Sequence, residues 1–249
     1  MWHELRIALA FLTILPVQVP AGLEGRALAR SAAFFPLAGW VLGILFLLAA
    51  RLFAALFGPG LVAALLLVAL LAWLTRGLHL DGLADLLDGL GGSHEPARRL
   101  AIMKDSGIGA FGVIGLILLL LVKASTLAAL LPVLLQEGNL PLLAPLVGAR
   151  WAMVTLAWRT SYPRPAGTGH PFVGRITGRE LGIGALFLLP LFMGDGSGLL
   201  AALAALLPAL WLRYKTRSAL GGVTGDVLGA SCELGETVGW LVLLALQGV

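Results

Sequence analysis

The sequence predicts an all-α fold, a polytopic bundle of helices embedded in a membrane. Hydrophobic residues make up 59% of the 249 residues and charged residues only 12%. The mean hydropathy of +0.97 lies outside the range of soluble globular domains. The apolar residues form long runs rich in Leu, Ala, Val and Gly, whereas the strands of a membrane barrel alternate between polar and apolar residues.

The first twenty residues differ from the later apolar runs. Their apolar stretch, Ile7 to Val19, is shorter than the roughly 20 residues that a helix needs to cross a bilayer. Arg6 is a weak basic flank, and no small-residue cleavage motif follows it, so the segment does not fit a cleaved signal peptide. We therefore expect residues 1–20 to form a retained re-entrant or interfacial segment.

About seven later runs are candidate transmembrane helices. The two runs on either side of residues 194–198 are short and could form one hairpin, so counts of six or eight stay open. No fixed-period repeat or long hydrophilic run is present, which predicts one membrane-embedded domain over residues 1–249. The seven candidate spans are 34–57, 60–80, 107–131, 141–158, 181–194, 197–212 and 227–247.

The distribution of Lys and Arg predicts the orientation of the chain. Connections that carry several basic residues alternate with connections that carry none, and the positive-inside rule places the basic ones in the cytoplasm. The amino end is then inside and the carboxyl end outside. The formal charge of +4 is explained by these loops, and no nucleic-acid-binding module is visible. The single cysteine, Cys232, excludes an intrachain disulfide and a multi-cysteine metal site.

Eight of the thirteen carboxylates lie in two short windows beside membrane-length runs. Ionised groups beside hydrocarbon are costly to desolvate, so this concentration indicates a cation site or a proton path. The predicted orientation puts both windows on the cytoplasmic side. They contain Asp81, Asp85, Asp88, Glu95 and Asp105 in the first window, and Asp226, Glu233 and Glu236 in the second.

The three aspartates of the first window share one face of a predicted helix. Asp81, Asp85 and Asp88 stand at i, i+4 and i+7. Their like charges repel unless they are hydrated, protonated or bridged by a cation, and Mg²⁺ suits carboxylates while it keeps waters and substrate phosphate oxygens. Gly82 and Gly89 lie beside this face, where they would admit a bulky ligand to the backbone. The alternative is a solvated helix end whose glycines serve helix packing.

The second window repeats this design at the start of the last predicted span. Asp226, Glu233 and Glu236 share a helical face, with the glutamates one to three turns deeper. Buried glutamates need a metal, a basic partner or a proton. Lys123 and Arg150 lie inside apolar runs, and either a structural ion pair or a phosphate contact would explain them.

Six short motifs stand in a fixed order along nearly the whole chain. They are Phe11-Leu12-Thr13-Ile14-Leu15-Pro16, Phe35-Pro36, Gly77-Leu78-His79-Leu80-Asp81-Gly82-Leu83-Ala84-Asp85 with Asp88-Gly89, Ile102-Met103-Lys104-Asp105-Ser106, Gly148-Ala149-Arg150-Trp151, and Gly222-Val223-Thr224-Gly225-Asp226. Together these motifs resemble the cobalamin synthase family. One position departs from the family pattern: Arg76 stands where a small residue is expected.

The resemblance implies a magnesium-dependent phosphotransfer that closes cobalamin biosynthesis. The adenosylcobinamide phosphate group would pass from adenosylcobinamide-GDP to the 5′ oxygen of α-ribazole, or of α-ribazole 5′-phosphate, with release of GMP. It also implies a multi-pass enzyme of the bacterial cytoplasmic (inner) membrane whose active site faces the cytoplasm. The enzyme would be embedded in the lipid bilayer. The resemblance leaves open whether it forms a homo-oligomer or associates with other cobalamin-assembly enzymes.

Residue roles follow from the resemblance and fit the acidic windows. Charge develops on phosphate oxygens during such a transfer, and a metal ion can neutralise it. The expected catalytic residues are Asp81, Asp85, Asp88, Asp105 and Asp226; the expected magnesium ligands are these five with Glu233 and Glu236; the expected substrate contacts are His79, Lys104, Arg150, Gly82 and Gly89.

Other classes of membrane protein compete with this interpretation. The stretch Asp85-Leu86-Leu87-Asp88-Gly89 is loosely similar to the Asp-x-x-Asp-Gly element of CDP-alcohol phosphotransferases, which also displace a nucleoside monophosphate. A cation-coupled transporter would carry carboxylates and glycine-broken helices as well, but near the bilayer midplane. A structural scaffold would leave the acidic faces unexplained.

Overall fold

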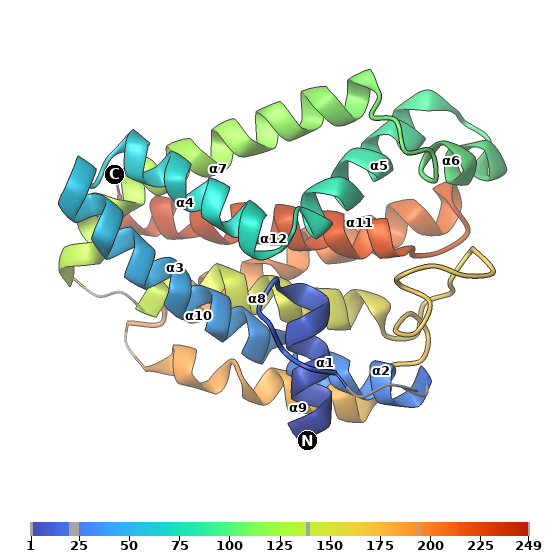
Figure 1. The fold of residues 1–249 in the computed structure, drawn as a ribbon, viewed down its shortest axis with the longest axis horizontal. Helices are drawn as coiled ribbons and strands as arrows, with labels where there is room; N and C mark the ends of the chain where they lie inside the picture. Colours follow the sequence, from blue (N-terminus) through green and yellow to red (C-terminus); the bar gives the residue numbers. More distant parts are fainter. Residues whose placement is uncertain (1, 20–24, 138–139, 194, 249) are drawn as a thin grey trace.

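The computed structural model describes residues 2–19, 25–137, 140–193 and 195–248, which are all helix, turn or loop without any strand. This confirms the predicted all-α class (Figure 1). The elements are α1 (Trp2–Leu12), α2 (Gly25–Ser31), η1 (Ala32–Phe34), α3 (Phe35–Phe57), α4 (Leu61–Leu74), α5 (Leu78–Gly92), α6 (Pro96–Ile102), α7 (Ala110–Glu137), α8 (Leu140–Ala157), α9 (Gly178–Leu186), η2 (Leu189–Phe192), α10 (Ser197–Ala204), α11 (Leu206–Ala219) and α12 (Gly225–Gln247).

Five helical segments in the described ranges are long and apolar enough to cross a membrane, and the pair α4 and α5 would make a sixth. This agrees with a multi-pass protein but does not confirm the count of seven. The predicted span over 181–194 overlaps α9 and contains the short 3-10 helix η2, and neither reaches membrane length. Its last residue, Gly194, lies outside the described residues. The five long segments are Gly25–Phe57, Ala110–Gln136, Leu140–Ala157, Ser197–Ala219 and Gly225–Gln247.

A sharp bend interrupts the span predicted over 60–80 close to its end. Helices α4 and α5 meet at 90°, because Arg76 and Gly77 have φ values of 56° and 66° and two consecutive left-handed residues cannot continue an α-helix. A left-handed backbone conformation favours glycine. Arg76, the residue that departs from the family pattern, therefore occupies a strained position. Its guanidinium donates hydrogen bonds to the carbonyl oxygens of Ala10 and Phe11, at 3.1 and 3.3 Å, which joins α1 to the bend.

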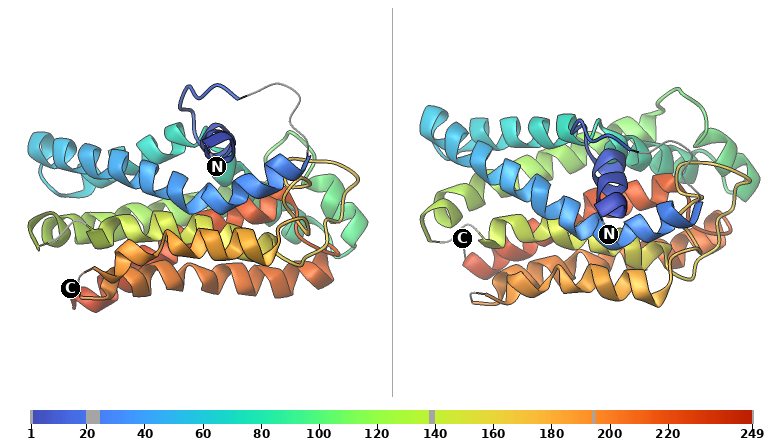
Figure 2. Two further views of the ribbon diagram at one scale, coloured as in Figure 1. Left: turned by 90° about the horizontal axis from the view of Figure 1, so that it is seen from below. Right: turned by 60° about the horizontal axis from the view of Figure 1, so that its bottom comes forward.

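Helix α1 fits the predicted interfacial segment. It has 11 residues, and at about 1.5 Å per residue it is too short to cross about 30 Å of hydrocarbon. It packs against α2, η1 and α3 and lies across the outside of the bundle (Figure 2).

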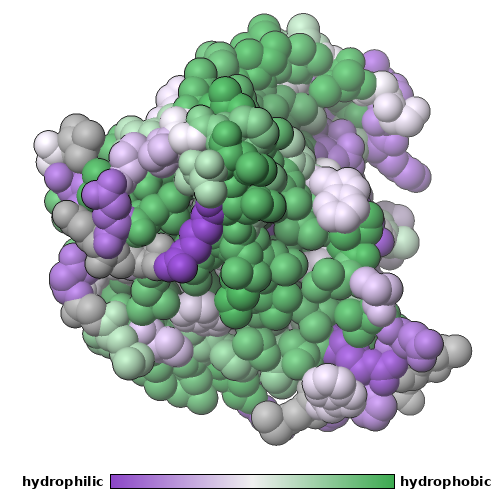
Figure 3. Space-filling model, turned by 60° about the vertical axis from the view of Figure 1, so that its left-hand side comes forward, coloured by the Kyte–Doolittle hydropathy of each residue, from purple (hydrophilic) through white to green (hydrophobic). Residues whose placement is uncertain are grey.

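The centre of the bundle is formed by α8 and α12, which pack against each other and against α3, α5 and α10. Small residues permit this closeness, as at Gly148, where the backbone of Ala202 leaves no room for a Cβ. Large apolar side chains point outward from α3, α4, α7 and α11, and hydrophobic residues cover most of the face seen in Figure 3, with hydrophilic residues toward its margins. This outer surface is suited to lipid.

One end of the bundle gathers connections that lie far apart in the sequence. Helix α6, the segment 158–177, helix α2 and the start of α12 all lie at this end, whereas α12 runs to the opposite end, where the C-terminus lies (Figures 1 and 2). The basic connections of the sequence therefore share one end with the start of the second acidic window.

Candidate active site

The two acidic windows lie side by side because glycines let α5 and α12 touch. A Cβ added at Gly82 would lie 2.9 Å from the Cα of Asp226, and one added at Gly229 would lie 3.1 Å from the Cα of His79. Any larger residue would push the helices apart. Gly82, predicted as a substrate contact, therefore faces the backbone of α12.

Three carboxylates lie within electrostatic reach of one another where these helices pass. The charges that act on Asp85 include those of Asp81, Asp226 and Arg164, so we call these four residues the aspartate cluster. Asp81 is exposed and Asp85 is half-buried, which leaves carboxylate oxygens open to a ligand. Asp81 also lines a recess of about 590 Å³ that reaches along α5 to α7.

The N-terminus of α12 fixes the position of Asp226. Thr224 caps the helix by accepting a hydrogen bond from the amide of Val227 at 3.3 Å, and its hydroxyl donates to Asp226 Oδ2 at 3.2 Å. Arg164 Nη1 donates to the same oxygen at 2.9 Å. These contacts therefore fix the orientation of the Asp226 carboxylate, and Arg164 partly neutralises its charge.

Arg164 is a site residue that sequence reasoning did not single out. It belongs to the 158–177 segment, which was interpreted only as a basic connection. The amide of Val223 donates to the carbonyl of Ser161 at 2.9 Å, and Gly169 packs on the backbone of Gly225, so the segment is docked on the start of α12. The Tyr-Pro-Arg-Pro sequence at 162–165 was the available signal, since prolines and nearby glycines favour a fixed non-helical path.

Tyr162 accompanies Arg164 in this docked segment. Its side chain is half-buried, and burial raises the pKa of its phenol above the ordinary value. Its hydroxyl has no hydrogen-bond partner among the described residues. The group therefore stays a neutral donor at physiological pH.

Asp88 points elsewhere than its two neighbours on α5. Its oxygens accept hydrogen bonds from the amides of Gly109 and Gly112, at 2.7 and 2.8 Å, and only 8% of the residue is exposed. The carboxylate thus caps the start of α7 and ties it to α5. Asp88 was predicted as a catalytic residue and metal ligand, and its observed contacts are those of a helix cap.

Replacing Asp88 by alanine is expected to lower stability strongly. Hydrogen bonds to a charged group contribute about 1.5–3 kcal/mol each, so Asp88→Ala should lower the free energy of unfolding by about 3 kcal/mol and speed hydrogen exchange at Gly109 and Gly112. Asp105→Ala is the matched control, because exposed Asp105 accepts a hydrogen bond from just one group in the described part of the chain, the nearby amide of Gly107, at 3.1 Å. Equal exchange rates in the two variants would contradict the capping role.

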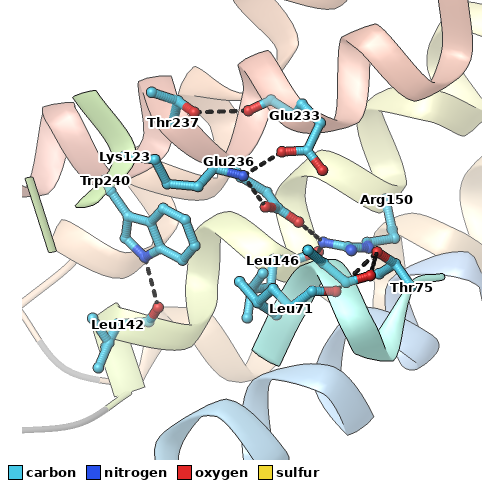
Figure 4. A network of polar contacts seen from close by, with 11 residues as sticks. Leu71, Thr75, Lys123, Leu142, Leu146, Arg150, Glu233, Glu236, Thr237 and Trp240 are labelled. Carbon is cyan, nitrogen blue, oxygen red and sulfur yellow. Dashed lines mark hydrogen bonds and ion pairs between the residues drawn. The ribbon is translucent and has the colours of Figure 1, made fainter. Parts of the chain in front are cut away.

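A buried four-residue charge network lies deeper in the bundle (Figure 4). Lys123 Nζ of α7 lies 2.5 Å from Glu233 Oε2 and 2.8 Å from Glu236 Oε2, and Arg150 of α8 pairs with the other oxygen of Glu236. At most 6% of any of these residues is exposed. Of the two alternatives for Lys123 and Arg150, the structure shows the ion pair.

This pairing changes the interpretation of three predicted site residues. Glu233 and Glu236 were expected to hold a metal and Arg150 to contact phosphate, but their charges compensate one another within the membrane-embedded core. Two cations face two carboxylates, so the network is neutral when all four are ionised. Its contacts are those of a structural network between α7, α8 and α12.

His79 is buried between the aspartate cluster and this network. Only 1% of it is exposed, and neither ring nitrogen has a partner among the described residues. Arg150, Glu236 and Lys123 all act on it electrostatically. His79 was predicted as a substrate contact, and the structure places it out of reach of solvent.

The remaining predicted residues lie outside the aspartate cluster. Lys104 and Asp105 are exposed on the connection between α6 and α7. Gly89 packs against the side chain of Met103, so it serves the contact of α5 with the end of α6.

The aspartate cluster could supply only some of the ligands of a magnesium ion. In the described ranges, no three His, Cys, Asp or Glu side chains converge closely enough to hold a metal ion unaided. Mg²⁺ is commonly bound by one or two carboxylates together with water and substrate phosphate oxygens. Asp81 and Asp85, one exposed and one half-buried, offer such a partial set.

Comparisons with known proteins agree with the motifs. The family model for cobalamin-5-phosphate synthase matches residues 4–244. An adenosylcobinamide-GDP ribazoletransferase of Syntrophobacter fumaroxidans is 43% identical over 249 residues, which cover 96% of each chain. A protein of the same name from Geotalea daltonii is 39% identical over 97% of each chain. Another from Pseudomonas fluorescens is 41% identical over 93% of this chain and 94% of the relative.

No solved structure matches this chain. The family match and the relatives nevertheless cover nearly its whole length, including both helices of the aspartate cluster. The resemblance drawn from the sequence motifs is thereby confirmed, and the chain belongs to the cobalamin-5-phosphate synthase family.

Proposed function

We propose that this protein is an adenosylcobinamide-GDP ribazoletransferase whose active site is the aspartate cluster. The observation that carries the proposal is that Asp81, Asp85 and Asp226 lie within electrostatic reach of one another on the touching helices α5 and α12, in a chain whose relatives bear that name. In the reaction, the 5′ hydroxyl oxygen of α-ribazole bonds to the phosphorus attached to the cobinamide arm. The bond from that phosphorus to the bridging oxygen breaks, and GMP leaves.

The chain's own residues have distinct parts in this step. Asp81 and Asp85 would hold Mg²⁺, which when bound neutralises charge on phosphate oxygens. The oxygen of Asp85 that does not bind the metal would accept the proton that the ribazole hydroxyl loses. Arg164 orients Asp226 and presents a guanidinium beside the carboxylates, where it can contact a phosphate oxygen.

A specific assay tests this proposal. The purified protein in lipid nanodiscs is incubated with adenosylcobinamide-GDP and α-ribazole, and GMP and adenosylcobalamin are measured with and without Mg²⁺. We expect both products in equal amounts, only when the metal is present. Absence of both products from folded protein would contradict the transferase and favour the transporter alternative.

We also propose that the cluster faces the cytoplasm of a bacterial cytoplasmic membrane. The basic connections gather at the end of the bundle where α12 begins, and α12 runs to the other end (Figure 2). A reporter fused to the C-terminus should therefore read extracytoplasmic, and one inserted between α6 and α7 should read cytoplasmic. The opposite pair of results would overturn the orientation.

A further inference from the structure

A second recess lies at the same end of the bundle as the aspartate cluster. It occupies about 360 Å³ between the C-terminal part of α11, the segment that follows α8 and the turn that precedes α12. Its lining residues are Arg159, Thr160, Ser161, Arg213, Arg217, Gly222 and Val223. We call it the arginine recess.

The arginine recess carries positive charge that no acidic side chain in its lining offsets. Three guanidinium groups line it and no carboxylate does, and none of the three forms an ion pair within the described part of the chain. Like charges that converge in this way repel, so an anion bound among them would be favoured. The guanidinium fork matches the oxygens of a phosphate group in particular.

Two of the three arginines are held in place before any ligand arrives. Arg213 donates hydrogen bonds to the carbonyl oxygens of Trp158 and Arg159, at 3.2 and 3.3 Å. The guanidinium of Arg159 lies 4.8 Å from the centre of the Trp158 ring, and Arg159 has a strained φ of 54°. A strained residue that neighbouring contacts maintain is typical of a functional position. Arg217 is exposed at the rim.

The arginine recess and the aspartate cluster are built partly from the same two segments of the chain. Ser161, which lines the recess, accepts the hydrogen bond from the amide of Val223, and the same two segments continue directly to Arg164 and Asp226. A ligand with two linked phosphates and a nucleoside could therefore extend from one site toward the other. The transferase substrate carries such a group.

We propose that the arginine recess binds the phosphate group of a nucleoside phosphate. This nucleotide is the guanylate that forms part of the substrate and leaves as the product GMP. This rests on the proposed transferase function. The same phosphate chemistry is found in anionic lipid headgroups, and the exposed Trp211 and Tyr214 of α11 are residues that favour a membrane interface. A test must therefore separate nucleotide from lipid.

The test compares Arg217→Glu with Lys215→Glu. Both residues are exposed on α11 and both changes reverse one charge, but only Arg217 lines the recess. Binding of GMP is measured by equilibrium dialysis without divalent metal, so that the aspartate cluster contributes little. In nanodiscs of phosphatidylcholine, we expect Arg217→Glu to weaken GMP binding at least tenfold and Lys215→Glu less than threefold.

A second arm uses nanodiscs that contain phosphatidylglycerol. If the recess holds a nucleotide, this lipid leaves the difference between the two variants unchanged. A lipid headgroup is the phosphate source if two results are found together. Phosphatidylglycerol then abolishes GMP binding by the unaltered protein, and the Arg217→Glu variant binds this lipid less well than the unaltered protein does. Equal behaviour of both variants toward GMP and lipid would overturn the proposal.

The transferase assay keeps this outcome separate from the proposed function. Normal formation of adenosylcobalamin with equal GMP binding by both variants would refute the arginine recess alone. GMP binding that depends on Arg217, without any transferase product, would refute the transferase and leave a nucleotide site.

Discussion

Replacing Asp85 by asparagine should abolish turnover while the protein remains folded in the membrane. Asn keeps the size of the side chain but removes the charge that would hold a metal and accept a proton. Losses of about 10²–10⁴-fold are typical when such a group is removed. We expect adenosylcobalamin formation to fall by at least about 10²-fold, with an unchanged melting temperature.

The control for this variant is Asp195→Asn. Asp195 lies in the connection before α10, and among the described residues it accepts hydrogen bonds only from Ser197, at 3.0 and 2.6 Å. The chemical change is identical, so membrane insertion and yield can be compared directly. Near-normal activity of Asp85→Asn would remove the aspartate cluster from the reaction.

Replacing Arg150 by methionine should be among the most destabilising single changes in the chain. Arg150 is fully buried and pairs with Glu236. Its loss leaves two buried carboxylates with Lys123 as their only cation in the network. Removing one partner of a buried ion pair costs about 3–5 kcal/mol, and we expect a fall of about 3 kcal/mol in the free energy of unfolding, measured in detergent by denaturant titration.

Two further variants separate charge from packing in this network. Arg51→Met removes an exposed arginine from α3 and should change stability by less than about 0.5 kcal/mol. The double variant Arg150→Met with Glu236→Gln restores charge balance, leaving Lys123 with Glu233. It should be more stable than Arg150→Met alone. If it is not, the cost arises from lost packing and not from an unbalanced charge.

Much of the fold was predictable because composition and run length report directly on a membrane environment. The runs that became α3, α7 and α12 are long and apolar, and they fold as membrane-length helices. The bend between α4 and α5 was not predictable from hydropathy. It depends on left-handed backbone at Arg76 and Gly77, and a non-glycine residue in that conformation gives little signal in a sequence.

The candidate site was also predictable from the sequence only in part. Helical periodicity placed Asp81 and Asp85 together, and the glycines that let α5 meet α12 were visible as a pattern. Periodicity also grouped Asp88 with them, but it cannot show that Asp88 is already bonded to the amides of Gly109 and Gly112. The partners of Glu233 and Glu236 lie on other helices, so only tertiary structure could choose between metal and ion pair. Arg164 was missed because loops have no periodicity.

Metal rescue of Asp85→Cys tests the central claim most directly. A thiolate binds Mg²⁺ poorly but binds softer cations such as Cd²⁺ well. If Asp85 holds the metal in the transferase reaction, Asp85→Cys should be inactive with Mg²⁺ and should regain activity with Cd²⁺, whereas the unaltered protein should gain nothing from Cd²⁺. Activity of Asp85→Cys with Mg²⁺ within a few-fold of that of the unaltered protein would contradict the assignment of the aspartate cluster as the active site.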